Sequence, residues 1–267
     1  MCIITPQIPA DDPAFPGDPT PQPPFLFRDS LRSLLLWSAG LSNLFGWMWV
    51  VRAIPKVSDY KRADFILKTM CRVVPLSCGI RIAVKGGRSL SKARAYVYVT
   101  NHVNIFDMFA IYKAVPGYTR SLEHIDHFSW PVIGPLITAA GQIPVDPDNK
   151  RLTAKGLRMA EKMLKQGDSL VVLPEGSRTL DGSVGPFYPG AFRIAVRAGA
   201  DIVPMAIRGG RRINRRGDWR VRPGKETVLI GKPISINGCS LEDADRLADT
   251  ARTAIIDLLQ GRCSPDV

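Results

Sequence analysis

The chain has 267 residues, 45% hydrophobic and 22% charged, which fits a globular protein that needs no metal or disulfide to hold its core. Its formal net charge of +12 predicts attraction to polyanions, either nucleic acid or an anionic membrane surface. The five cysteines are scattered and form no C-x-x-C motif, which excludes a disulfide framework and a cysteine zinc site. They are predicted to be reduced thiols in a protein that faces the cytosol.

Residues 1–24 contain eight prolines and little apolar material, so they are predicted to be disordered or extended. No basic start followed by an apolar run occurs there, which argues against a signal peptide.

The segment Ser33–Val51 carries no charge, contains three tryptophans, and is flanked by Arg32 and Arg52. As a helix, its nineteen residues just reach the ~30 Å thickness of the hydrocarbon layer. Small and polar residues dilute it, and tryptophans with basic flanks suit the headgroup layer. We therefore expect an anchor that dips into one leaflet, with a spanning helix and a soluble core helix as alternatives.

Residues 59–75 are predicted to form a second, amphipathic helix that ends near Pro75, because Phe65, Ile66, Met70 and Val73 recur at helical spacing. Residues 25–75 together are expected to form a membrane-associating helical pair.

Strand and helix patterns alternate over residues 76–267, which predicts an α/β domain with a largely parallel central sheet flanked by helices. The expected strands are residues 79–84, 95–100, 142–145, 169–173, 202–207 and 227–230. The expected helices are residues 105–114, 152–165, 191–198 and 241–259, the last capped by Ser240.

The first polar motif, N-H-V-N-I-F-D, runs from Asn101 to Asp107 directly after a predicted strand. On one ideal helix, His102 and Asp107 are about 140° apart and cannot meet. They meet if His102 lies in the turn and Asp107 lies one turn into the following helix. The carboxylate then orients the imidazole, whose other nitrogen accepts a proton from a hydroxyl. Taken alone, the pair is also compatible with a histidine that merely caps a helix.

The second motif, P-E-G-S-R-T, spans residues 174–179 and also follows a strand. Gly176 permits close approach of a ligand to the backbone, and Arg178 offers a planar set of donors suited to phosphate. Ser177 adds a hydroxyl, and Glu175 is expected to orient an arginine or a ligand hydroxyl. An ordinary polar turn with a Glu–Arg ion pair is the alternative.

Taken together, the ordered motifs make residues 76–235 resemble the glycerolphosphate acyltransferase family, which includes lysophosphatidic acid acyltransferases. The matching blocks are N-H-x4-D at residues 101–107, P-E-G-S-R-T at 174–179, F-x-x-G-A at 187–191, and the V-P strand at 202–206.

The resemblance implies that His102 is the general base on the acceptor hydroxyl and that Asp107 holds it in place. It also implies that Arg178 binds the phosphate of the substrate. The residues expected to bind substrate are Asn101, Glu175, Gly176, Ser177, Arg178, Phe187 and Gly190. Acyl-CoA or acyl-carrier protein would be the donor, and the hydroxyl would attack the thioester without an acyl-enzyme. The absence of a G-x-S-x-G motif agrees with this. No cofactor and no metal are expected.

Two positions depart from the family pattern. Pro147 stands where the family often has an arginine, and Tyr188 and Pro189 occupy a block that often carries lysine. Lys150 or Arg151 is the candidate replacement for the phosphate contact. Because of these departures, a lysophospholipid or a lyso-aminolipid is an alternative acceptor.

Seven arginines, with Trp219 among them, lie within residues 208–222. A basic loop with an aromatic residue is also typical of nucleic-acid binders. Because the loop follows the V-P strand in a chain with a tryptophan-rich apolar segment, we favour an anionic membrane surface and expect no nucleic acid. Alternatives are the phosphates of CoA, an acidic carrier protein, and a solvated loop.

The expected function is acyl transfer to the 2-hydroxyl of 1-acylglycerol 3-phosphate, giving phosphatidic acid at the cytoplasmic face of a membrane. The alternatives are acylation of another lysolipid and a non-catalytic lipid-binding protein.

Overall fold

The computed structural model describes residues 24, 26–53, 60–91, 93–146 and 148–265. The expectation of disorder for residues 1–24 therefore lies outside the described residues, apart from Pro24. The position of Pro147, where the family often has arginine, also lies outside them.

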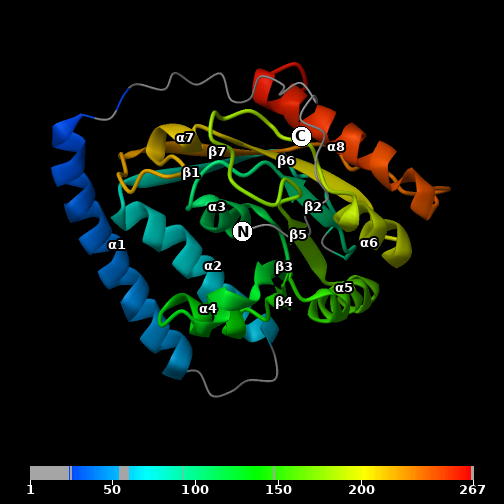
Figure 1. Cartoon of the computed structure of the whole chain (residues 1–267), viewed down its shortest axis with the longest axis horizontal. Helices are drawn as coiled ribbons and strands as arrows, with labels where there is room; N and C mark the ends of the chain where they lie inside the picture. Colours follow the sequence, from blue (N-terminus) through cyan, green and yellow to red (C-terminus); the bar gives the residue numbers. More distant parts are fainter. Residues whose placement is uncertain (1–23, 25, 54–59, 92, 147, 266–267) are drawn as a thin grey trace.

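A seven-stranded sheet in the order β1-β7-β6-β2-β5-β3-β4 forms the centre of the protein (Figure 1). All neighbouring pairs are parallel except β6 and β7, which are antiparallel. The predicted α/β fold with a largely parallel sheet is therefore confirmed. The strands are β1 (Ile80–Lys85), β2 (Val97–Thr100), β3 (Thr119–His124), β4 (Ile143–Val145), β5 (Ser169–Val172), β6 (Ile202–Arg208) and β7 (Gly224–Ile230).

Helices cover both faces of the sheet, because the central strands are apolar on both sides. One core cluster joins the sheet to α5 (Lys150–Lys165), α6 (Gly190–Ala198) and α8 (Ala244–Gln260). Ser240 and Asp243 form a capping box at the short 3-10 helix η2 (Leu241–Asp243) that precedes α8, as the sequence predicted.

The opposite core cluster joins the sheet to α3 (Asp107–Ala114) and to side chains of the N-terminal helix α1 (Phe27–Ala53). A third cluster joins α1, α2 (Tyr60–Ser77) and α4 (Ile133–Ala139), which lie together on the left of Figure 1. The predicted helical pair is thus present and packs on the rest of the fold.

Helix α2 continues through Pro75 to Ser77, whereas the sequence placed its end near the proline. Proline removes only one N–H donor, and the Cys78 N–H closes the last turn by donating to the Pro75 carbonyl at 3.0 Å. Four elements were not predicted: β3, α4, the 3-10 helix η1 (Ile125–Ser129) and α7 (Gly210–Ile213).

Candidate active site

Three adjacent parallel strands bring the sequence motifs together. Strands β5, β2 and β6 are neighbours, and at their carboxyl ends stand the P-E-G-S-R turn, the His102 turn and the loop of residues 209–223. Ligands of open α/β sheets bind outside the carboxyl ends of the strands, so this site lies where sheets of this kind bind their ligands.

His102 and Asp107 lie in contact, with His102 Nδ1 2.6 Å from Asp107 Oδ2. Asp107 is the first residue of α3, rather than one turn inside it as expected. Its Oδ2 also accepts the backbone N–H groups of Val103 (2.7 Å) and Asn104 (3.1 Å), so the carboxylate holds the whole turn. The Asp107 side chain is fully buried and that of His102 is 25% exposed, which leaves Nε2 as the ring atom for a substrate proton.

Asn101 positions the turn that contains His102 through hydrogen bonds to β6. Its side-chain oxygen accepts the Ile207 N–H at 2.8 Å, and its side-chain N–H donates to the Ile207 carbonyl at 3.1 Å. These two bonds extend the pairing of β2 with β6 by one residue beyond Thr100. Asn101 is buried, and these two bonds fix the backbone beside His102, while its contact with substrate stays a prediction.

Glu175 joins the two motif turns through hydrogen bonds to their backbones. Its Oε1 accepts the His102 N–H and its Oε2 accepts the Gly185 N–H, both at 2.9 Å. Burial raises the pKa of Glu175 to about 8; the two N–H donors oppose that rise, and the nearby Asp107 adds to it. Gly176 has a φ of 70°, a left-handed conformation that explains glycine in this turn.

The P-E-G-S-R turn brings Arg178 near the His–Asp pair. The Thr179 N–H donates to the His102 carbonyl at 3.0 Å, and the Arg216 guanidinium donates to the Arg178 carbonyl at 2.7 Å and reaches Ser177 Oγ at 3.5 Å. Burial lowers the pKa of Arg178; the Asp107 carboxylate opposes this and Arg216 adds to it. Arg178 therefore carries its charge beside both the His–Asp pair and another arginine.

Phe187 and Gly190, the other residues expected at the substrate, take structural positions. Phe187 is buried in the core and stacks on Phe192 with ring centroids 6.4 Å apart, and Gly190 begins α6. Phe187 therefore packs in the core, and its contact with substrate stays a prediction.

Lys150 and Arg151, the candidate phosphate contacts, begin α5 and are exposed. They follow β4, which is three strands away from β2, or roughly 14 Å across the sheet. The structure thus separates them from His102.

Two buried polar residues outside the predicted site support the His102 turn. Asn104 donates a side-chain N–H to Glu226 Oε1 at 2.7 Å, and its own oxygen accepts the Phe106 N–H. A Cβ on Gly210 would lie 2.3 Å from Asn104 Nδ2 and 2.5 Å from Glu226 Oε1. The second asparagine of N-H-V-N was a visible signal for this role, whereas nothing local marked Glu226.

Several arginines of residues 208–222 contact other parts of the protein. Arg208 donates to the Leu258 carbonyl at the end of α8, and Arg211 donates to the Leu180 carbonyl. Arg220 pairs with Asp218, and Arg222 pairs with Asp29 of α1. Within the described residues, no group of three or more His, Cys, Asp or Glu side chains is arranged to hold a metal ion.

The model of the family described as Acyltransferase matches residues 81–208, a range that contains both motif turns and the three strands that carry them. The class that this match and the site define is an acyltransferase. The match agrees with the resemblance to the glycerolphosphate acyltransferase family that the motifs predicted.

Similar proteins bear related names. A 1-acyl-sn-glycerol-3-phosphate acyltransferase of Chlamydomonas reinhardtii is 27% identical over 90% of this chain and 72% of its own length. One from Limnanthes douglasii is 30% identical over 62% of this chain, which spans 59% of that relative. The crystal structure of the 1-acyl-sn-glycerophosphate acyltransferase PlsC from Thermotoga maritima has the same fold, with a TM-score of 0.75 and 22% identity over 88% of this chain and 96% of that one.

Proposed function

We propose that this protein moves a fatty acyl group from a thioester donor to the 2-hydroxyl of 1-acylglycerol 3-phosphate, giving phosphatidic acid. The observation that carries the proposal is the contact of 2.6 Å between His102 Nδ1 and the buried Asp107 carboxylate. The imidazole ring of His102 remains partly exposed to solvent. The match to the Acyltransferase family model and the names of the relatives support the acceptor class.

In the proposed reaction, His102 Nε2 takes the proton of the acceptor hydroxyl as its oxygen attacks the thioester carbonyl. A carbon–oxygen bond forms, the carbon–sulfur bond breaks, and the imidazolium returns the proton to the thiolate. Asp107 holds the tautomer with hydrogen on Nδ1 and stabilises the imidazolium.

We assign the acceptor phosphate to Arg178, because the glycerol hydroxyl and phosphate are on adjacent carbons and both must bind close to His102. The contact of Thr179 with the His102 carbonyl keeps the Arg178 turn beside the histidine. An arginine fork suits phosphate oxygens. Arg178→Ala is expected to raise mainly the KM for a phosphate-bearing acceptor, and an unchanged KM would remove Arg178 from the phosphate site.

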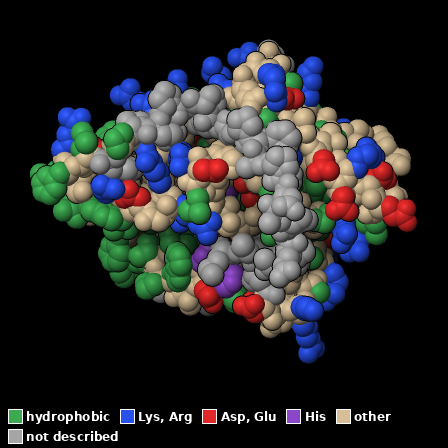
Figure 2. Space-filling model, turned by 45° about the horizontal axis from the view of Figure 1, so that its top comes forward, with side chains coloured by type: hydrophobic (Ala, Val, Ile, Leu, Met, Phe, Trp, Pro, Cys, Tyr) green, Lys and Arg blue, Asp and Glu red, His purple; other side chains and the backbone are tan. Residues whose placement is uncertain are grey.

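We also propose that α1 and α2 (within residues 25–75) hold residues 76–267 against an anionic membrane at its cytoplasmic face. Helix α1 is long and apolar enough to cross a membrane, and only 22% of its apolar window is buried. Figure 2 shows hydrophobic side chains gathered on the left of the molecule, the side on which α1 lies in Figure 1. The exposed apolar side chains of α1 include Phe27, Leu31, Leu34, Leu35, Leu41, Phe45, Trp49 and Val50.

The mode of membrane association that we propose is a helix lying in one leaflet. The opposite side of α1 packs on α2, on α4 and on the loop of residues 209–223, through Leu44, Val51 and Ser33. A helix that crossed the bilayer would draw these folded partners into the hydrocarbon layer, where loops with polar backbone groups are costly.

The decisive experiment is a product assay with purified protein, labelled acyl-CoA and a panel of lysolipids. The expected result is phosphatidic acid from 1-acylglycerol 3-phosphate. Pro147, Tyr188 and Pro189, which replace basic residues of the family pattern, favour a second candidate, acylation of a lysophospholipid or lyso-aminolipid. Product from one of those acceptors and none from 1-acylglycerol 3-phosphate would replace the first candidate by the second.

A further inference from the structure

A hollow beside the Arg178 turn, which we call the arginine pocket, has a volume of about 520 Å³. Its walls come from the first turn of α1, the turn after β5 and the loop of residues 209–223. The lining residues on which the inference rests are Ser30, Leu180, Arg215, Arg216, Trp219 and Arg220. The mechanism proposed above does not use this pocket.

The walls of the pocket carry more positive than negative charge. They hold three arginines and one carboxylate, Asp218, and that carboxylate already forms a two-nitrogen pair with Arg220 at 2.7 and 2.9 Å. Burial lowers the pKa of Arg215, and the neighbouring Arg211 and Arg222 lower it further. A concave wall with excess positive charge attracts anions, and guanidinium groups match phosphate geometry.

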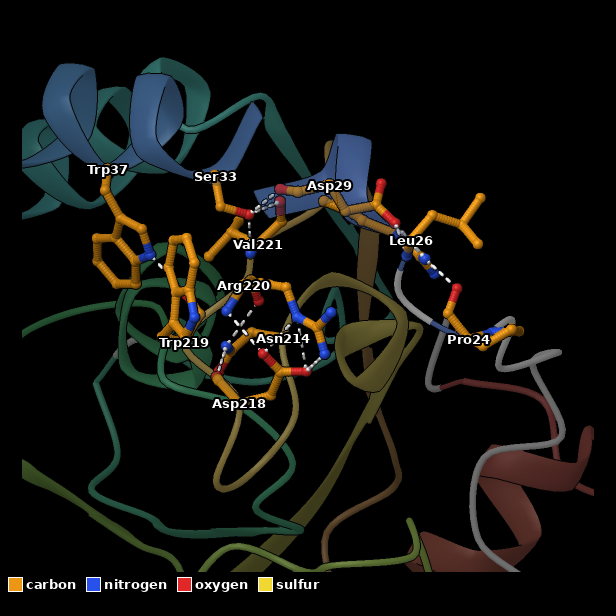
Figure 3. A network of polar contacts seen from close by, with 11 residues as sticks. Pro24, Leu26, Asp29, Ser33, Trp37, Asn214, Asp218, Trp219, Arg220 and Val221 are labelled. Atoms are coloured by element: carbon orange, nitrogen blue, oxygen red, sulfur yellow. Dashed lines mark hydrogen bonds and ion pairs between the residues drawn. The ribbon is translucent and has the colours of Figure 1, made fainter. Parts of the chain in front are cut away.

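The loop that builds the pocket is fastened to α1 (Figure 3). The Trp37 indole N–H donates to the Trp219 carbonyl at 2.7 Å, and the Val221 N–H donates to Ser33 Oγ at 2.8 Å. Asp29 and Arg222 pair at 2.6 Å, and hydrogen bonding with Arg222 is the main reason why the pKa of Asp29 falls to about 2. The loop backbone that carries the pocket arginines is therefore held in place before a ligand arrives, and Arg216 is held further by the Arg178 carbonyl, which lowers the entropy lost on binding.

The pocket and His102 contact the same turn at different residues. Arg216 reaches the carbonyl of Arg178, and Thr179 reaches the carbonyl of His102. Of the remaining wall residues, Ser30 belongs to α1, and Figure 3 shows Trp219 beside Trp37 of α1. A phosphate in the pocket is thus separated from the reacting hydroxyl by the Arg178 turn, an arrangement that suits a donor whose phosphates are joined to its thioester by a long arm.

Trp219 adds an aromatic surface to this basic wall. Its side chain is 50% exposed in the pocket lining, between Asp218 and Arg220. An exposed indole among arginines can stack on a nucleobase while the guanidinium groups bind phosphate. A phosphate ion alone would not contact the Trp219 indole and would not fill the pocket.

We propose that the arginine pocket binds the adenosine 3′,5′-bisphosphate end of a coenzyme A thioester, with Arg215 and Arg216 on phosphate and the Trp219 indole on adenine. This inference rests on the proposed function for its thioester donor, and it selects CoA over a carrier protein. The pantetheine arm then runs past the Arg178 turn to His102.

The test compares acyl-CoA with acyl-dephospho-CoA, which lacks the 3′-phosphate. In the native protein, loss of that phosphate is expected to raise the donor KM about 10-fold or more, as for a charge-assisted hydrogen bond. In Arg215→Gln the two donors should have nearly equal KM values, while the acceptor KM changes less than about twofold. Arg193→Gln, which removes an exposed arginine of α6, is the matched control and should behave like the native protein.

A binding measurement separates this inference from the proposed function. Titration calorimetry of the full chain in detergent with adenosine 3′,5′-bisphosphate needs no turnover and no acceptor. We expect binding that weakens about 10-fold in Arg215→Gln and in Trp219→Ala and persists in His102→Ala. Absence of nucleotide binding, turnover with acyl-carrier protein alone, or a rise in acceptor KM instead of donor KM would each overturn the assignment. Nucleotide binding without acyl transfer would instead reject the proposed function alone.

Discussion

The backbone N–H of His102 donates to Oε1 of Glu175 at 2.9 Å, across 73 residues of sequence. The second oxygen of the same carboxyl group holds Gly185, in the loop that follows the P-E-G-S-R turn. One buried acid thus sets the distance between the histidine turn and the turn that carries Arg178.

Glu175 makes the stability of the fold depend on pH. Its pKa in the folded protein is about 8, against 4.5 for an unperturbed glutamate, so the unfolded chain releases this proton first as pH rises. Its contribution to stability is complete below pH 4.5 and is lost as pH rises through 8, by at most about 1.4 kcal/mol per pH unit. Unfolding midpoints between pH 5 and 9 should fall less steeply in Glu175→Gln. Parallel curves for the two proteins would contradict this placement.

Loss of the His102 imidazole is expected to remove turnover without loss of fold. The side chain is partly exposed and Asp107 keeps two backbone N–H donors without it, so the turn remains capped. His102→Ala should lower kcat about 10³-fold, the scale of general base catalysis. Circular dichroism and vesicle binding should match those of the native protein. Turnover within tenfold of the native rate would reject His102 as the base and leave the lipid-binding alternative open.

Asp107→Asn tests the positioning role of the carboxylate. The amide presents one acceptor oxygen in place of an anion that now accepts from the ring and from two backbone groups. We expect kcat to fall about 10²- to 10⁴-fold with little change in either KM, because the imidazolium loses its stabilising charge. An Asn variant with native kcat would show that the 2.6 Å contact is only structural.

Asn101 is predicted to contribute to stability rather than to substrate binding. Asn101→Ala leaves the buried N–H and C=O of Ile207 without partners, which costs about 1–3 kcal/mol for each group. Urea unfolding should therefore show a loss of about 2–5 kcal/mol. The exposed Asn237 gives a matched control, and Asn237→Ala should change stability by less than about 0.5 kcal/mol. Equal stability of the two variants would contradict the role given to Asn101.

The exposed apolar face of α1 is predicted to bind membranes. Leu35 and Phe45 are 68% and 50% exposed, so changing both to Asp disturbs little packing. Flotation with anionic vesicles should show affinity reduced at least about 10-fold, because two apolar contacts are lost and two charges meet the headgroup layer. Leu241→Asp, at an exposed leucine of η2, is the control on another surface. Equal flotation of all three proteins would argue against α1 as the contact.

The sequence predicted the strands and helices whose apolar residues repeat with a clear period, because such repeats depend only on neighbours along the chain. It did not reveal β3, whose segment T-R-S-L-E-H is mostly polar and is stabilised by its parallel neighbours β5 and β4. The position of α4 likewise depends on packing against α1 and α2. The antiparallel pairing of β7 with β6 was also invisible in the local pattern.

For the site, the sequence by itself determined the chemical groups: an imidazole and a carboxylate five residues apart, and an arginine in a glycine-containing turn after a strand. Only the tertiary structure decided their partners. It joined Asn101 to Ile207 and Glu175 to the His102 backbone, and it closed the arginine pocket by bringing Trp37 to Trp219 across 182 residues. The physical reason is that residue type and spacing are properties of a local segment, whereas burial and hydrogen-bond partners arise from segments that meet only when the sheet assembles.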